Sequence, residues 1–189
     1  MPGYLFVVSG PSGVGKTVLC DEMLKRYSGE LVYSISATSR NPRGTETDGR
    51  EYFFYSREQF EKALQENQFA EWARVHDNYY GTPKSFLNKN LDAGKHVLLN
   101  IDVQGAAKIR QSYPQAILFF ILPPSMEALE TRLRKRNVDS DEVLQRRLAN
   151  AREEISHQKD YHHVLTNDDL KTCVDNLARI IDKYIHSTP

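Results

Sequence analysis

The stretch SGPSGVGKTVL (residues 9–19) places three glycines and a lysine between an apolar run and an amphipathic segment. Residues 10–17 fit the pattern G-x-x-x-x-G-K-[ST], with a predicted strand before it and a predicted helix after it. Glycines at these positions let backbone N–H groups turn toward an anion, and the first turn of the helix adds its positive end. The stretch therefore predicts a cradle for the phosphates of a nucleoside triphosphate. A plain glycine turn would need neither the lysine nor this glycine spacing.

The eight positions of the pattern are expected to bind a triphosphate together. Lys16 is predicted to reach the β- and γ-phosphates, and Thr17 to offer its hydroxyl to Mg²⁺, which makes Mg²⁺ the expected cofactor. The other positions shape the cradle through their backbone. The candidate residues are Gly10, Pro11, Ser12, Gly13, Val14, Gly15, Lys16 and Thr17.

Outward from this loop, short apolar runs alternate with segments of helical periodicity. Strand character is found at residues 4–9, 31–37, 96–101, 116–122 and 162–166. Helical periodicity is found at residues 15–27, 83–93, 103–112, 125–136, 140–158 and 168–186, and the last two helices are expected to start after Asp139 and Asn167. This alternation predicts an α/β fold with a parallel sheet flanked by helices on both faces.

Residues 38–82 interrupt that alternation. The segment is rich in polar and aromatic residues and contains EYFFYS, the helix-like REQFEKALQEN, and FAEWARVHDNYYGTP. This composition predicts a small mixed insertion, with short antiparallel strands and one helix, placed over the edge of the sheet like a lid.

Composition limits the function classes that fit the chain. The 189 residues carry 25 Lys plus Arg and 25 Asp plus Glu, so no global field favours nucleic acid or an anionic membrane. The apolar run at 116–122 is too short to span a bilayer, and the N-terminus lacks the pattern of a signal peptide. Cys20 and Cys173 fit reduced, buried thiols. A cytoplasmic protein without nucleic-acid or membrane partners is expected, while monomer and homo-oligomer both remain open.

Two clusters in the insertion are candidate acceptor-binding groups. Arg40, Arg43 and Tyr52 combine guanidinium forks with a phenol, which suits a second phosphate, although a solvated charged loop has the same composition. Glu71 lies beside Trp72, and a carboxylate here is able to accept from N1–H and the exocyclic amine of guanine, an edge that adenine lacks. A surface glutamate on a strand is the competing interpretation.

A third cluster is the basic run RLRKRNVDSDEVLQRRL (residues 132–148). Arginines delivered over a triphosphate neutralise charge that develops during phosphoryl transfer. A solvated helix face is the alternative that a charge run usually indicates. The cations of this run are Arg132, Arg134, Lys135, Arg136, Arg146 and Arg147.

Several segments, in order and with matching spacing over nearly the whole chain, resemble the guanylate kinase family. They are GPSGVGKT, SISATSRNPR, DGREYFF, FAEWARVHDNYYGTP, NIDVQGA, FILPPS, RRLANAREEISH and TNDDL. The resemblance implies Mg²⁺-dependent phosphorylation of GMP by ATP on a P-loop kinase core. It also implies one domain over residues 1–189, with a core at 1–37, 83–131 and 148–189, a GMP-binding lobe at 38–82, and a helical lid at 132–147.

The resemblance assigns residues to each substrate. Asn167 is expected near the adenine of ATP, and Arg136 and Arg147, joined by Arg132, on the triphosphate as catalytic groups beside Lys16. Glu71 corresponds to the acid that reads guanine, Ser36 and Thr82 to residues near its O6, and Asp102 to an acid near the substrate and, indirectly, the metal. The implied GMP-binding residues are Ser36, Arg40, Arg43, Tyr52, Glu71, Tyr80, Thr82 and Asp102.

The chain departs from the family pattern at a few positions. Asn100 stands where the family usually carries an acid, and Asn137 and Val138 replace a usual Gly-Thr in the lid. A function of another class also has to be considered, namely a guanylate-kinase-like scaffold domain that binds phosphorylated peptides. Such relatives typically have degraded P-loops, whereas Lys16 and Thr17 are present here.

Overall fold

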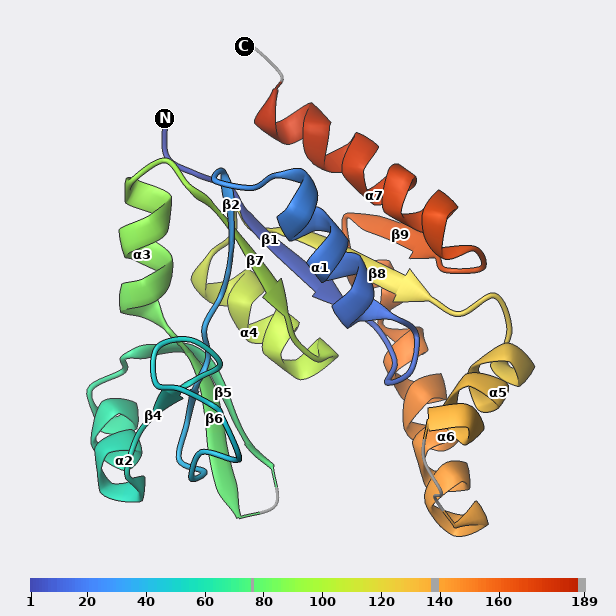
Figure 1. Cartoon of the computed structure of the whole chain (residues 1–189), viewed down its shortest axis with the longest axis horizontal. Helices are drawn as coiled ribbons and strands as arrows, with labels where there is room; N and C mark the ends of the chain where they lie inside the picture. Colours follow the sequence, from blue (N-terminus) through green and yellow to red (C-terminus); the bar gives the residue numbers. More distant parts are fainter. Residues whose placement is uncertain (76, 137–139, 187–189) are drawn as a thin grey trace.

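A parallel five-stranded sheet forms the centre of the molecule, as Figure 1 shows for the computed structural model. The structure describes residues 1–75, 77–136 and 140–186, without the side chain of Arg136. The strand order is β2-β7-β1-β8-β9, and every neighbouring pair is parallel. The strands are β1 (Leu5–Ser9), β2 (Leu31–Tyr33), β7 (His96–Asn100), β8 (Ile117–Leu122) and β9 (His163–Thr166).

Helices cover both faces of this sheet, as the alternation of elements predicts. One face packs against α1 (Lys16–Arg26) and α7 (Leu170–Ile185), and the other packs against α3 (Lys84–Asp92) and α4 (Val103–Ser112). Successive residues of β1 alternate between the two layers, because side chains along a strand point to opposite faces. Two apolar layers therefore clamp the central strands, and the loops at the carboxyl ends of β1 and β7 are held on a rigid base.

The insertion forms a second, four-stranded sheet in the order β4-β3-β6-β5. Its strands are β3 (Ala37–Thr38), β4 (Phe53–Phe54), β5 (Phe69–Val75) and β6 (Asn78–Pro83), and its helix is α2 (Arg57–Gln65). The rings of Phe60 and Phe69 stack with centroids 4.3 Å apart and form part of a small separate core beneath α2. The predicted mixed character is confirmed. The β3–β6 and β5–β6 pairs are antiparallel as expected, whereas the β3–β4 pair is parallel, so for that pair the expectation is wrong.

The helices after β8 form a third unit beside the central sheet (Figure 1). They are α5 (Met126–Arg136) and α6 (Asp141–Ser156), followed by the short 3₁₀ helix η1 (Gln158–Asp160). Leu129 and Leu133 of α5 pack against Leu144 and Leu148 of α6. This pairing holds the basic residues of both helices near the loop that follows β1.

Three local expectations differ from the structure. The single strand predicted at 31–37 is two strands in different sheets, because the chain leaves the central ladder after Ser34 N–H donates to Leu98 O. Asn167 is not the N-cap of the last helix, since the Asp169 carboxylate accepts from Thr172 N. At α6 the cap is Ser140, whereas the predicted cap, Asp139, lies outside the described residues.

Candidate active site

The loop between β1 and α1 has the conformation of an anion cradle. Gly10, Gly13 and Gly15 all have positive φ, at 141°, 87° and 102°. A Cβ on Gly10 would lie 2.3 Å from Ile121 O, and one on Gly15 would lie 2.6 Å from Asn167 Nδ2. Glycine is therefore needed at both positions for two reasons: the backbone has a positive φ, and neighbouring atoms leave no room for a Cβ.

A polar cleft of about 360 Å³ opens over this loop and fits the phosphates of a nucleotide. Lys16 Nζ donates to the carbonyl oxygens of Gly10 and Pro11, so its ammonium is held inside the loop. Burial lowers the pKa of Lys16, while the charges of Glu154 and Asp102 act in the opposite direction. The residues lining the cleft are Gly10, Ser12, Gly13, Gly15, Lys16, Thr17, Asn100, Asp102 and Glu154.

The same cleft contains oxygen groups that fit Mg²⁺. The Thr17 hydroxyl lies 3.5 Å from Asn100 Nδ2, and the carboxylates of Asp102 and Glu154 line the same wall. Mg²⁺ prefers such hard ligands and usually keeps several waters and substrate phosphates in its shell. In the described part of the chain, no cluster of three His, Cys, Asp or Glu side chains forms a dedicated metal cage. The donor set therefore fits a metal ion that arrives with a nucleotide.

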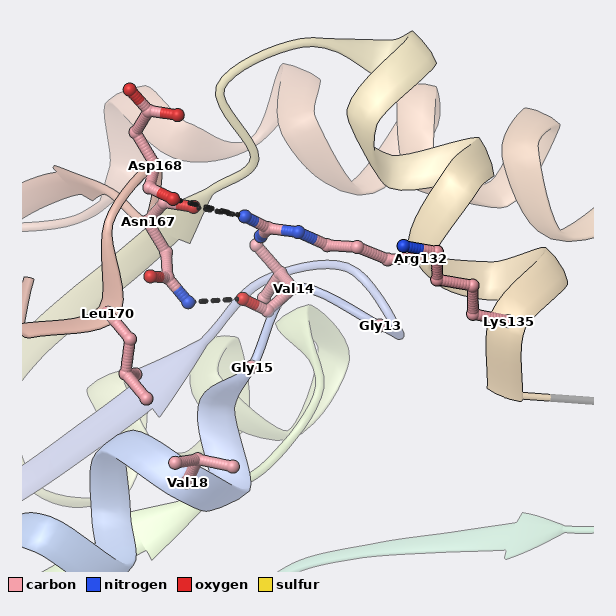
Figure 2. Close-up of a pocket in the computed structure, with 9 residues that line it drawn as sticks. All are labelled: Gly13, Val14, Gly15, Val18, Arg132, Lys135, Asn167, Asp168 and Leu170. Atoms are coloured by element: carbon pink, nitrogen blue, oxygen red, sulfur yellow. Dashed lines mark hydrogen bonds between the residues drawn. The ribbon is translucent and has the colours of Figure 1, made fainter.

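A second cleft, of about 340 Å³, lies on the other side of the loop, between α1, α5 and the segment after β9 (Figure 2). Asn167 Nδ2 donates to Val14 O at 2.8 Å and so ties this segment to the loop. Among the described residues, the buried Asn167 Oδ1 has no hydrogen-bond partner. With the apolar side chains of Val18 and Leu170 nearby, this acceptor suits an amino-substituted aromatic ring.

Arginines of α5 and α6 close over these two clefts. Arg132 donates to Asn167 O at 2.9 Å and to Asp168 O at 3.3 Å, which places it at the wall of the second cleft. Arg147 donates to Ser12 Oγ at 2.9 Å, across 135 positions of sequence. Two of the three predicted lid arginines are thus brought to the loop. The side chain of Arg136, and the expectations for Asn137 and Val138, lie outside the described residues.

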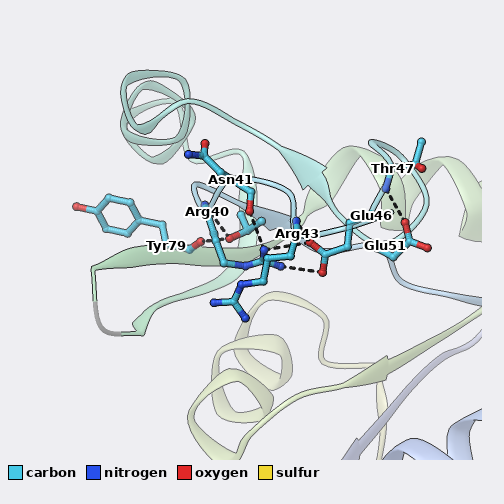
Figure 3. Close-up of polar contacts among 8 residues, drawn as sticks. Arg40, Asn41, Arg43, Glu46, Thr47, Glu51 and Tyr79 are labelled. Atoms are coloured by element: carbon cyan, nitrogen blue, oxygen red, sulfur yellow. Dashed lines mark hydrogen bonds and ion pairs between the residues drawn. The ribbon is translucent and has the colours of Figure 1, made fainter.

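The insertion gathers a second set of anion-binding groups. The Arg40 guanidinium lies 5.5 Å from the centre of the Tyr52 ring, and the Tyr52 and Tyr80 rings are 6.0 Å apart. Arg43 belongs to the same loop, where its backbone N–H donates to Glu46 Oε2 at 2.8 Å (Figure 3). The structure therefore brings the predicted phosphate-binding residues onto one surface.

Glu46 organises this surface. Its two carboxylate oxygens each lie 3.0 Å from a different terminal nitrogen of Arg40 (Figure 3). The hydrogen bond from Arg40 lowers the pKa of Glu46, and the backbone of Arg43 adds to the effect. Arg40 is thus held in one orientation by a bidentate contact.

Glu71 lies deeper, on β5, with only 9% of its surface exposed. Thr82 Oγ1 donates to Glu71 Oε1 at 2.6 Å, so the Thr82 hydroxyl holds this carboxylate. Burial raises the pKa of Glu71, the Thr82 hydrogen bond opposes the rise, and the charge of Asp102 adds to it. Ser36, also placed near the base by the sequence, directly precedes β3, where its carbonyl accepts from Phe53 N–H.

Asp102 lies between the loop cleft and Glu71 of the insertion. It is the N-cap of α4, where its Oδ1 accepts from Gly105 N–H at 2.8 Å, and it also lines the phosphate cleft. A Cβ built on Gly105 would lie 3.2 Å from Glu71 Oε2 and 3.4 Å from Asp102 Oδ1, which shows how close the two acids are. The carboxyl end of the central sheet therefore joins the loop cleft to the insertion.

A family model described as guanylate kinase matches residues 3–184 of the chain. The chain belongs to the guanylate kinase family. Members of this family are nucleoside monophosphate kinases, which makes the chain an enzyme of the transferase class. The expectation drawn from the sequence segments is confirmed.

Individual guanylate kinases are similar over most of the chain. A guanylate kinase of Caldanaerobacter subterraneus is 46% identical over 95% of this chain and 86% of its own length. One from Carboxydothermus hydrogenoformans is 47% identical, covering 95% and 87%. The crystal structure of guanylate kinase from Anaplasma phagocytophilum superposes with a TM-score of 0.73 at 34% identity, covering 99% of this chain and 88% of the other.

Sequence reasoning missed one acid in the guanylate kinase cleft. Glu154 of α6 lines the phosphate cleft, and burial raises its pKa while the charge of Lys16 opposes the rise. In the sequence it is one of two adjacent glutamates on an amphipathic helix, a pattern that normally indicates a solvated face. Only the packing of α6 beside the loop reveals it.

Proposed function

We propose that the chain transfers the γ-phosphoryl group of ATP to GMP, giving ADP and GDP. The observation that carries the proposal is that the glycine loop and the Glu71 carboxylate lie on opposite sides of Asp102. On one side lies the glycine cradle with Lys16, and on the other lies the buried Glu71 carboxylate. Two nucleotides bound in these sites would meet with their phosphates facing each other.

The donor is proposed to occupy the loop and the cleft beside it. Backbone N–H groups of residues 10–17 would hold its phosphates. Asn167 Oδ1, an acceptor without a hydrogen-bond partner among the residues that the structure describes, would receive the adenine amine. Mg²⁺ would be held through Thr17 and, indirectly, Asp102. When bound, it neutralises charge between the β- and γ-phosphates.

The acceptor is proposed to lie on the insertion. Arg40, Arg43, Tyr52 and Tyr80 would bind the GMP phosphate, because guanidinium forks and phenols complement its oxygens. Glu71 would accept from N1–H and the exocyclic amine of guanine, with Ser36 and Thr82 beside the base. Adenine lacks that pair of donors, so Glu71 would select guanine.

The transfer itself requires positioning and charge neutralisation by this chain's residues. Lys16, Arg132, Arg136 and Arg147 would stabilise charge on the transferred group, and the bound acceptor phosphate would attack in line. No covalent intermediate on the protein is needed. Closure of the lobe (38–82) and the lid (132–147) would exclude water, which competes for the phosphoryl group.

The test is ADP release from MgATP measured with a panel of nucleoside monophosphates. GMP is expected to be preferred over AMP, CMP and UMP by several orders of magnitude, since a site built to pair polar groups discriminates by up to about 10⁴. A reaction without acceptor measures water as a competing nucleophile. Equal rates with AMP and GMP would reject the guanine assignment.

A scaffold domain that binds phosphopeptides is not favoured. The relatives matched over 95% of the chain are guanylate kinases, and Lys16, Arg132 and Arg147 lie in or beside the glycine loop, which supports an enzyme.

In the described part of the chain no helix is long and apolar enough to cross a bilayer. We also propose a cytoplasmic location, which the two buried thiols Cys20 and Cys173 support.

A further inference from the structure

Gly105 is an unexpected residue in the first turn of α4. Unlike Gly10 or Gly15, it has ordinary helical backbone, which any residue adopts, and glycine is less favourable there than alanine. The reason for glycine lies in what surrounds it. A Cβ would stand 3.2 Å from Glu71 Oε2, 3.3 Å from Ile101 Cδ1 and 3.4 Å from Asp102 Oδ1. The first two distances are shorter than nine in ten real Cβ contacts, so an added Cβ would require Glu71 Oε2 and Ile101 Cδ1 to give way by a few tenths of an ångström.

Lys108 makes a second contact between α4 and β5, one turn after Gly105. Residues three apart lie on one face of a helix, so Gly105 and Lys108 both face β5. Lys108 Nζ donates to Trp72 O and lies 5.2 Å from the centre of the Trp72 ring. The residue that follows Glu71 is therefore fastened to α4 by both its backbone and its side chain.

Glu71 is fixed from the opposite side as well. Thr82 Oγ1 on the neighbouring strand β6 holds Oε1, while Oε2 rests against the bare backbone of Gly105. The charge of Lys108 also lowers the pKa of Glu71, against the effect of burial. The carboxylate is thus held between a hydroxyl of the insertion and a helix of the core.

We propose that Gly105 and Lys108 form a support on α4 that determines guanine specificity by fixing the position of Glu71. The inference rests on the proposed function, because it assumes that Glu71 reads the base. Both are positioning residues, since they act through Glu71. A carboxylate displaced by a few tenths of an ångström is no longer able to accept from both guanine donors with good geometry.

The main test compares GMP with IMP, which keeps N1–H but lacks the exocyclic amine. Gly105→Ala in the full chain is expected to raise the KM for GMP and to lower the GMP-over-IMP preference in kcat/KM about tenfold. The KM for MgATP should stay within about twofold, because the added Cβ would lie 3.4 Å from Asp102 Oδ1, which is an ordinary contact that does not require this cleft residue to move. Binding of guanosine should weaken to the same extent as that of GMP, since the defect concerns the base.

Lys108 provides a second, independent variant. Lys108→Met is expected to lower the GMP-over-IMP preference, as Gly105→Ala does. Lys108→Arg should retain most of the wild-type preference, because a guanidinium still donates to Trp72 O. Ala107→Gly is the matched control. It changes helix propensity on the same helix at an exposed position, so the nucleotide preference should stay that of the wild type.

Two results would overturn the proposal. One is a folded Gly105→Ala protein, verified by its melting curve, that keeps the wild-type preference for GMP over IMP. The other is an equal loss toward ATP and GMP, which would indicate general destabilisation. If Gly105→Ala does not fold, the same two criteria apply to Lys108→Met. A wild-type protein that does not phosphorylate GMP would instead reject the proposed function itself.

Discussion

At Glu71 we expect stability and substrate specificity to make opposite demands on one side chain. The protein buries its carboxylate, and burial raises the pKa of Glu71. The folded state therefore holds the Glu71 proton more tightly than the unfolded chain. The free energy of unfolding consequently falls as pH rises through the window between the unfolded value of 4.5 and the raised folded value.

Glu71→Gln is expected to separate the two effects. The amide keeps an acceptor for Thr82 and carries no buried charge, so the free energy of unfolding at pH 7.5 should equal or exceed that of the wild type. The gain should shrink as the pH falls to about 3.5, below the unfolded value of 4.5, where most Glu71 is protonated in both states. Urea titrations at pH 7.5 and at about pH 3.5 measure this. The same variant should lose GMP preference over AMP by about 10³-fold or more. A less stable variant at pH 7.5 would contradict the expected cost of burial.

Lys16→Ala tests the cradle. We propose that the Lys16 ammonium faces the transferred phosphate, so its removal should lower kcat by about 10³-fold. The melting temperature should change little, because the hydrogen bonds of the Lys16 ammonium within the described part of the chain go to carbonyls of its own loop. Steady-state kinetics at saturating GMP and a thermal melt check both parts. Lys25→Ala is the control, since Lys25 is an exposed residue of the same helix paired with Glu22. Turnover within tenfold of the wild type would reject the role of Lys16.

At the residue scale, a functional residue could be predicted when the groups that it acts with lie close to it in the sequence. The three loop glycines and Lys16 were predicted because their chemistry is written in one short pattern. Gly105, Lys108 and Glu154 were not, since their importance arises only where α4 and α6 meet β5 and the loop. A glycine with ordinary helical backbone carries no local signal that a carboxylate 34 positions earlier lies against it.

At the element scale, α2 is the helix that shapes the insertion. Its N-terminus has a complete capping box, in which Ser56 Oγ accepts from Gln59 N–H and the Gln59 side chain accepts from Ser56 N–H. The helix presents Phe60 to the small aromatic core of the insertion. The stability of the insertion therefore depends on how this helix begins.

Ser56→Ala should lower the free energy of unfolding by about 1 kcal/mol, because the Gln59 N–H loses its acceptor, the Ser56 hydroxyl. Ser56→Asp should retain most of the stability, since aspartate is an equally good N-cap. Urea denaturation of the three proteins measures the difference. Equal destabilisation by both substitutions would mean that the capping box contributes little.

Most elements were predictable from apolar periodicity, and the exceptions have local causes. A continuous apolar run such as residues 116–122 predicts a central strand, and β8 is found there. The run 31–37 fails because periodicity cannot show that the chain changes sheets after Tyr33. The helix caps fail by one or two residues, because several good capping residues stand side by side at both helix starts.

At the scale of the whole molecule, the central sheet carries two further units, the insertion and the α5–α6 pair. The insertion and the α5–α6 pair project from the central sheet in Figure 1, each with its own small apolar cluster. Separate cores permit rigid-body motion, and domain closure around ligands is a common use of such motion. We expect the insertion and the lid to close when both nucleotides are bound.

Small-angle X-ray scattering tests this closure. A compact chain of this length has a radius of gyration of about 16 Å. The free protein should lie above that value, and a mixture of GMP with a nonhydrolysable MgATP analogue should bring it closer. Each nucleotide alone should give a smaller change, because only one site is filled. An unchanged radius with both ligands would contradict closure.

The pairing of Arg40 with Glu46 bears on the anions that surround the protein in solution. In the free protein a carboxylate already balances this guanidinium, so the proposed phosphate site is not a bare positive surface. An inorganic phosphate ion in this site would meet the charge of Glu46 as well as the phosphate-binding groups, and would make no contact with Glu71. A nucleotide would meet the same repulsion, but on our proposal it would also contact Glu71 through its base. Electrostatic balance in the empty site would thus reject the abundant small anion and admit the rarer ligand that carries a base.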